Sequence, residues 1–117
     1  MPNDCWNNLT IISHNNKNQL KNLYEEELKD KKKNIIYKGS RGIKIEVWSP
    51  NEPNYKWLES LLEKYDECWV KNEWHEEGGK AGVWIGGKLY ETKIEIKSMS
   101  WEDLTIEGQY YYFKKDE

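Results

Sequence analysis

The chain has little of what several functional classes require. Its only cysteines are Cys5 and Cys68, too few for a disulfide scaffold or for a zinc site of their own. No apolar run is long enough for a membrane span. The N-terminus has neither a basic stretch nor an apolar one, so no signal peptide is expected and the cytoplasm is the expected location.

The chain also lacks a basic excess. Its 18 Lys and Arg residues face 21 Asp and Glu residues, for a formal net charge of -3. Binding to nucleic acid draws much of its affinity from clustered positive charge, so a nucleic-acid partner is not expected. The two Gly pairs, at 78–79 and 86–87, lack the context of a phosphate-binding loop and indicate turns. No metal-ligand spacing is present, so neither a metal nor a cofactor is expected.

Tryptophan is abundant instead, with seven residues against a single phenylalanine. The chain is otherwise polar, with 33% charged residues and a mean hydropathy of -1.05. Trp is large and carries one N–H that requires a partner when it is buried. The excess therefore indicates either a core built from a few large side chains or an exposed stacking surface.

Periodicity predicts one domain over residues 1–117. Alternating apolar and polar residues indicate strands at 6–12, 34–38, 43–47, 67–75, 81–85, 89–97 and 109–114. One helix is expected after a cap at Asn15 or Asn16. A second is expected from a capping box at 49–52, with Pro50 at the first helical position and Pro53 able to shift the start.

This order is β-α-β-β-α-β, which predicts a ferredoxin-like α+β fold with two helices on one face of an antiparallel sheet. Residues 89–117 are expected to form a β-rich C-terminal extension, with a hairpin about 86–87. The first and fourth strands should be antiparallel neighbours. Cys5 and Cys68 both begin their strands, so they should lie at opposite ends of the sheet, without a disulfide.

Several segments resemble the YubB-type ferredoxin-like domain family of plasmids and phages. The opening P-N-x-C-x-N-x-L-T-I, the segment W-S-P-x-x-P at 48–53, and the E-G and A-G pairs at 77–78 and 81–82 are similar to that family's motifs. The similarity covers roughly residues 1–90. This chain departs from the family by having Asp4 before the cysteine, with Trp6 after it, and Ser13 where a Gly is usual.

The resemblance implies the same fold and a setting in a phage or another mobile element, in the cytoplasm of the host cell. A role in counter-defence is one candidate in that setting. The family implies no established activity, so no catalytic residue is carried over from it.

Catalysis has one candidate in the residues themselves. The expected register brings Cys5 near His75, a combination that serves in thiolate nucleophiles and metal sites. The nearby carboxylates would raise the thiol pKa, and no third orienting group is identifiable. We therefore expect no enzyme and interpret Cys5 as a small buried residue.

The aromatic residues give the binding hypothesis. If alternate residues of strand 43–47 face the helices, Lys44 and Trp48 point to the open face of the sheet. The full set of expected ligand-binding residues is Trp48, Trp69, Trp74, Trp84, Lys44, His75 and Glu77. The competing interpretation is that the C-terminal aromatic residues cover this face and make a second core.

The resulting expectation is a non-catalytic binding protein that holds or sequesters a small, nucleotide-like ligand with Trp side chains at the sheet. The alternative is a protein–protein interaction module that self-associates or inhibits a host protein through an aromatic patch. The expected partners are thus a small molecule or a host protein, with a homo-oligomer possible.

Overall fold

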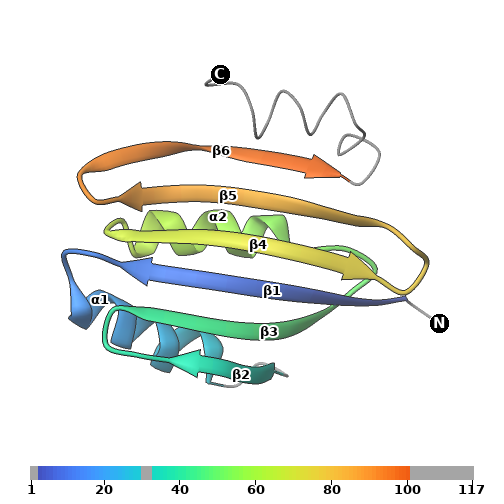
Figure 1. Ribbon diagram of the computed structural model, residues 1–117, viewed down its shortest axis with the longest axis horizontal. Coiled ribbons are helices and arrows are strands. Elements are labelled where there is room, and N and C mark those ends of the chain that lie inside the picture. Colours follow the sequence, from blue (N-terminus) through green and yellow to red (C-terminus); the bar gives the residue numbers. More distant parts are fainter. Residues whose placement is uncertain (1–2, 30–32, 101–117) are drawn as a thin grey trace.

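A single antiparallel sheet of six strands organises the molecule, in the order β2-β3-β1-β4-β5-β6. The structure is a computed structural model that describes residues 3–29 and 33–100. Its strands are β1 (Asp4–Ser13), β2 (Lys33–Lys38), β3 (Gly42–Pro50), β4 (Cys68–Glu76), β5 (Ala81–Leu89) and β6 (Thr92–Ser100). The helices are α1 (Lys17–Leu23), which continues into the π-helix η1 (Tyr24–Leu28), and α2 (Tyr55–Lys64). All of them lie on the same side of the sheet (Figure 1).

The expected α+β class and the helices on one face are confirmed. β1 and β4 are antiparallel neighbours, as expected, and β1 also pairs with β3. The sheet is not a classic ferredoxin-like βαββαβ one, because the order β2-β3-β1-β4 continues into β5 and β6. β5 pairs with β4 along most of its length, and its outer edge is paired in turn by β6. The sheet therefore extends to six strands in one layer.

The two cap predictions had different outcomes. The side chain of Asn16 caps α1 by accepting a hydrogen bond of 3.0 Å from the N–H of Gln19, so that prediction is confirmed. The start of the second helix at 49–52 was wrong, because Ser49 and Pro50 complete β3. α2 begins at Tyr55 instead, where the Asn54 side chain accepts a hydrogen bond of 3.2 Å from the N–H of Trp57.

The last hairpin also differs from the expectation. β5 runs through the Gly86–Gly87 pair, and the chain turns at Tyr90, which has a φ of 57°. Gly87 has a φ of 108° and lies where the pairing with β6 shifts register. A Cβ at this position would collide with the carbonyl oxygen of Cys68. The pair therefore forms a bulge within a strand. The strand expected at 109–114 lies outside the described residues.

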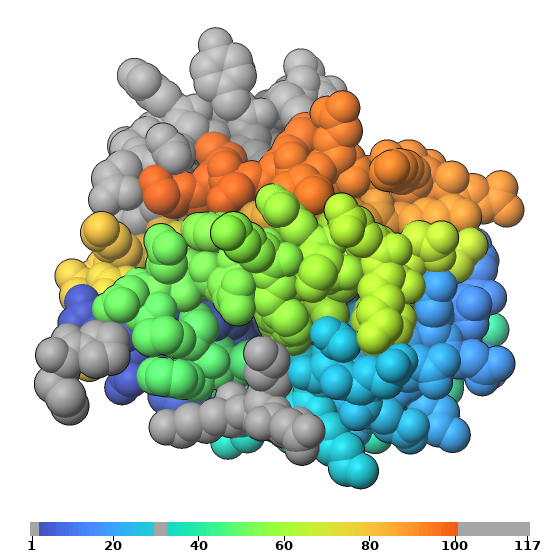
Figure 2. All heavy atoms as spheres, turned by 180° about the vertical axis from the view of Figure 1, so that it is seen from behind, coloured from blue at the N-terminus to red at the C-terminus, as the bar shows by residue number. Residues whose placement is uncertain are grey.

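The core lies between the sheet and the helices. Alternate residues of the central strands, such as Leu9 and Ile45, pack against helix residues such as Leu23 and Leu58. Figure 2 shows this helix-covered face, with α1 beside α2. The opposite face carries no helix among the described residues. We call the two sides the helix-covered face and the helix-free face.

The cysteine prediction is confirmed by the register of β1 and β4. Cys5 lies opposite Glu76, and Cys68 lies opposite Ser13, at the other end of the same pair of strands. Both cysteines are buried and unbridged. Within residues 3–29 and 33–100, no helix is long and apolar enough to cross a membrane.

Candidate functional site

The helix-free face carries one row of aromatic side chains. Trp48 of β3 lies directly opposite Trp6 of β1, and Trp6 lies directly opposite His75 of β4. Both Trp rings are partly buried, and His75 is exposed. The indole N–H of Trp48 donates a 2.7 Å hydrogen bond to Asp4 Oδ1, which fixes that ring. The structure therefore brings Trp48 and His75 onto one face, with Trp6 between them.

Of three other expected site residues, Lys44 and Trp69 lie at a distance from this row, whereas Glu77 bonds to Asp4 beside it. Lys44 is exposed on the helix-free face, four residues before Trp48 on β3. Trp69 shares that face, but it stands near the opposite end of β4 from His75. Glu77 lies in the turn after β4, where its Oε1 accepts a 2.9 Å hydrogen bond from the N–H of Asp4. The three do not converge on one ligand position.

Trp74 and Trp84 belong to the other side of the sheet. Because successive residues of a strand face opposite ways, Trp74 points away from the face of His75. Trp84 is 1% exposed and is part of the core, and Trp74 is 6% exposed. Neither ring has a surface open to a ligand, which corrects their place in the expected set. Trp84 packs in the core cluster, and Trp74 is buried on the same face of the sheet.

The same alternation separates Cys5 from His75. His75 lies opposite Trp6, whereas Cys5 lies opposite Glu76, so the two side chains are on different faces and form no pair. Burial raises the pKa of the Cys5 thiol, with smaller contributions in the same direction from Glu76 and Glu52, while a hydrogen bond with Ser49 acts against them. A buried, neutral thiol is a poor nucleophile.

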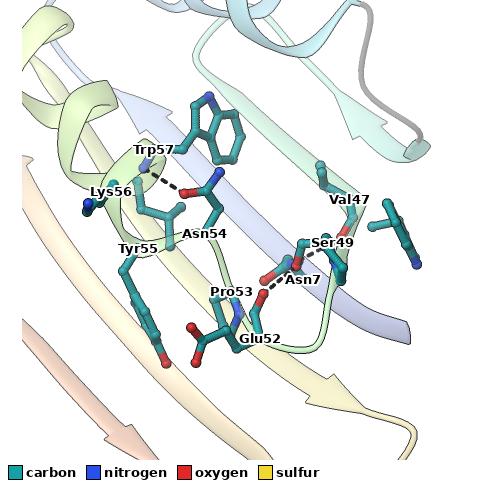
Figure 3. Close-up of a pocket in the computed structure, with 12 residues that line it drawn as sticks. Asn7, Val47, Ser49, Glu52, Pro53, Asn54, Tyr55, Lys56 and Trp57 are labelled. Atoms are coloured by element: carbon teal, nitrogen blue, oxygen red, sulfur yellow. Dashed lines mark hydrogen bonds between the residues drawn. The ribbon is translucent and has the colours of Figure 1, made fainter. Parts of the chain in front are cut away.

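A cleft of about 680 Å³ lies between the end of β3 and the start of α2 (Figure 3). We call it the β3–α2 cleft. Its size falls in the range of small-molecule sites. It is lined by Asn7, Val47, Trp48, Ser49, Pro50, Glu52, Pro53, Asn54, Tyr55, Lys56, Trp57 and Leu58.

A buried polar network forms the floor of this cleft. Asn7 Nδ2 donates to the carbonyl oxygen of Val47 at 3.0 Å and to Ser49 Oγ at 2.8 Å. Asn7 Oδ1 accepts a 2.9 Å hydrogen bond from Asn72 Nδ2. Ser49 Oγ donates to the carbonyl oxygen of Glu52 at 2.8 Å. These bonds hold the loop before α2 against the sheet and give the cleft a rigid floor.

Aromatic and charged side chains from the start of α2 form the wall of the cleft. In Figure 3 the ring of Trp57 stands beside Asn54, across the cleft from Val47. Burial raises the pKa of the Tyr55 hydroxyl, Glu52 adds to this rise, and a hydrogen bond with Ser98 opposes it. Tyr55 therefore stays protonated at neutral pH and can donate a hydrogen bond.

Motif residues from distant parts of the sequence meet at this end of the sheet. The N–H of Asn3 donates to Asn51 Oδ1 at 2.9 Å, and the N–H of Asn51 donates back to the carbonyl oxygen of Asn3 at 2.7 Å. Asn3 Nδ2 also donates to Glu76 Oε2 at 2.9 Å. The opening motif, the W-S-P segment and the turn after β4 are thus joined into one structure beside the β3–α2 cleft.

The sequence hypotheses missed most of the cleft. Asn7, Ser49 and Asn54 were not expected to line a site. Trp57 was interpreted as part of a helix core stripe, and it does pack against the core cluster as well as lining the cleft. The available signal was the recurrence of small polar residues inside otherwise apolar strands. Asn7 and Asn72 occupy inward positions on β1 and β4, where an apolar residue is usual.

None of the family models, curated proteins or solved structures compared with this chain matches it. The similarity to the YubB-type family therefore stays a prediction. Among the residues that the structure describes, no group of three or more His, Cys, Asp or Glu side chains is arranged to hold a metal ion.

Proposed function

We propose that this chain is a non-catalytic binding protein that holds the nucleoside part of a small ligand in the β3–α2 cleft. The observation that supports this most directly is a cleft of about 680 Å³ with a hydrogen-bonded floor and an aromatic wall. The proposal keeps the expected ligand class and moves its site from the helix-free face to the start of α2.

The lining favours an uncharged planar group over a polyphosphate. Trp57 offers a ring, and stacking of a base on an aromatic ring contributes about 1–3 kcal/mol. Asn54 uses its oxygen to cap α2, so its amide N–H₂ is a donor on the cleft wall. Lys56 and Glu52 carry opposite charges at the cleft, and a polyphosphate would meet as much repulsion as attraction there.

The expected affinity is modest. At roughly 0.3 kcal/mol per non-hydrogen atom, a nucleoside of about twenty such atoms would gain about 6 kcal/mol, a Kd in the tens of micromolar. Such a protein would act by sequestration, which requires affinity but no chemistry. That activity suits the phage or mobile-element origin implied by the resemblance.

Calorimetric titration with nucleosides and their monophosphates tests the proposal. Trp57→Leu should weaken binding by about tenfold or more, because the stacking contribution is lost. Trp69→Leu is the matched control, since Trp69 lies on the helix-free face, and its affinity should equal that of the wild type. Circular dichroism confirms that both variants are folded. Absence of binding by every ligand, or equal binding by the two variants, would refute the proposal.

A second function is favoured by an exposed apolar edge. β2 is an edge strand, and three consecutive side chains on it are exposed: Ile35 at 47%, Ile36 at 57% and Tyr37 at 64%. Exposed edges with apolar side chains are prone to pair with another chain. This supports the alternative of a protein–protein interaction module, with a second copy as the simplest partner.

A further inference from the structure

A second, smaller hollow lies at the other end of β3 from the β3–α2 cleft. It has a volume of about 320 Å³ and opens between α1 and the hairpin that joins β2 to β3. We call it the lysine pocket. It is lined by Lys17, Asn18, Leu20, Lys21, Tyr24, Glu25, Lys38, Gly39, Ser40 and Ile43.

The three lysines of this pocket have no carboxylate partner among the described residues. The ion pairs within residues 3–29 and 33–100 use Lys64, Lys71 and Lys88 instead. The Nζ of Lys38 lies 3.7 Å from the centroid of the Tyr24 ring, a cation–π contact that places its charge at the pocket. Glu25 alone among the lining residues is acidic.

This arrangement of charge is unfavourable for the helix that carries it. Lys17 and Lys21 are four residues apart on α1, a spacing at which like charges repel. Lys17 also stands in the first turn, which has no acidic residue and where the helix dipole favours negative charge, whereas Lys21 in the last turn is favourably placed for the dipole. An anion in the pocket would reduce the repulsion between Lys17 and Lys21. It would also supply negative charge near the first turn of α1.

We propose that the lysine pocket binds the phosphate group of a small phosphorylated molecule. Lysine ammonium groups act as point charges toward phosphate. The volume of about 320 Å³ suits a compact phosphorylated molecule. Ser40 adds a hydroxyl donor at the rim. The pocket is separate from the β3–α2 cleft, and this inference does not depend on the proposed function.

Titration with inorganic pyrophosphate, inorganic phosphate and glycerol phosphate at low salt tests the inference. Pyrophosphate should bind and raise the melting temperature. Lys21→Gln and Lys38→Gln should each weaken binding by about tenfold, because each removes a charge-assisted hydrogen bond. Lys93→Gln is the matched control, since Lys93 is exposed on β6, and should leave the affinity unchanged. Comparing the affinity for glycerol phosphate with that for inorganic phosphate shows whether the pocket prefers a phosphate ester or the free anion.

Two results would overturn the inference. One is the absence of pyrophosphate binding at millimolar concentration in low salt. The other is an equal loss of affinity in all three variants, which would indicate general electrostatic attraction instead of a site. Amide chemical shifts that move around α1 and the β2–β3 hairpin, and not around β6, would locate the anion directly.

Discussion

Individual tryptophans in this chain have unrelated roles. Trp84 fills the core at 1% exposure, Trp48 is held by Asp4 on the helix-free face, and Trp57 lines the β3–α2 cleft. The same residue type therefore contributes to packing, to strand pairing and to a candidate binding wall. The effect of replacing one tryptophan therefore predicts little about the effect of replacing another.

Core and surface tryptophans should differ sharply in their effect on stability. Trp84→Ala should lower the free energy of unfolding by about 3–5 kcal/mol, because it removes a large, fully buried ring. Trp69→Ala removes a partly exposed ring from the helix-free face and should cost about 1 kcal/mol. Urea denaturation of both variants measures the difference. Similar losses would mean that Trp69 is covered as fully as Trp84.

The sequence predicted which side chains are buried where apolar and polar residues alternate so that only one face of a strand is apolar. Strand 43–47 has one apolar face, with Ile43 and Ile45 on it, and both residues are buried. Strand 67–75 has aromatic or apolar residues in both phases, so its inward face could not be chosen from sequence. The structure decides it, because Cys68 and Val70 belong to the core cluster.

One carboxylate links the hairpin from β4 to β5 with the N-terminal strand, beside the backbone hydrogen bonds that close the hairpin. Glu76 Oε1 accepts a 3.1 Å hydrogen bond from the N–H of Lys80, and Oε2 accepts one of 2.9 Å from Asn3 Nδ2. The backbone N–H of Lys80, followed by the amide of Asn3, lowers the pKa of Glu76. The hairpin and the N-terminal strand therefore share one ionisable anchor.

Acid should weaken this anchor. Because the folded pKa of Glu76 lies below its unfolded value of about 4.3, its contribution to stability is present above that value. The contribution is lost as pH falls through the folded pKa. Glu76→Gln should lower stability at neutral pH and show a smaller loss on acidification than the wild type. Urea denaturation at several pH values measures this, with Glu59→Gln on the exposed side of α2 as control. An unchanged acid dependence in Glu76→Gln would contradict the prediction.

Elements were predicted well, and their ends were not. The sequence from Ser49 to Glu52 matches a capping box, yet Ser49 is held in the ladder opposite Cys5 and its hydroxyl bonds to Glu52. At this point, the pairing of β3 with a strand more than forty residues away replaces the local helix cap that the sequence predicts. The turn predicted at Gly86–Gly87 was also wrong, because two consecutive glycines are compatible with a bulge as well as with a turn.

At the scale of the whole molecule, the two edges of the sheet determine how it can associate. β2 and β6 are the outer strands of the sheet that residues 3–29 and 33–100 form. Ile36 on β2 is 57% exposed, and Ile96 on β6 is 48% exposed. Pairing through β2 would extend the sheet without disturbing the β3–α2 cleft, so association and ligand binding are separable.

Light scattering tests pairing of two copies through β2. Under the interaction alternative, the wild type should exceed its 14.1 kDa chain mass as concentration rises. Ile36→Lys should remain monomeric, because a charge on the edge opposes strand pairing. Ile96→Lys, on the opposite edge, should associate like the wild type. If the wild type is a monomer at every concentration, self-association through β2 is excluded.

The candidate site was the least predictable part of the molecule. Its floor joins Asn7 of β1 to Ser49 of β3 and to Asn72 of β4, which lie 42 and 65 residues after Asn7 in the sequence. Each asparagine alone indicates only a polar strand position. Their convergence depends on the sheet order and on register, which periodicity alone does not fix.

The central place of β1 has a consequence for how the chain is made. β1 leaves the ribosome before both of its neighbours, β3 and β4, and Asn3 bonds to Glu76 across 73 positions. Until β4 has emerged, β1 has at most one partner, and its apolar side chains stay incompletely covered. Such distant pairings slow folding. Among the described strands, β1 is therefore the one whose second partner is synthesised latest after it.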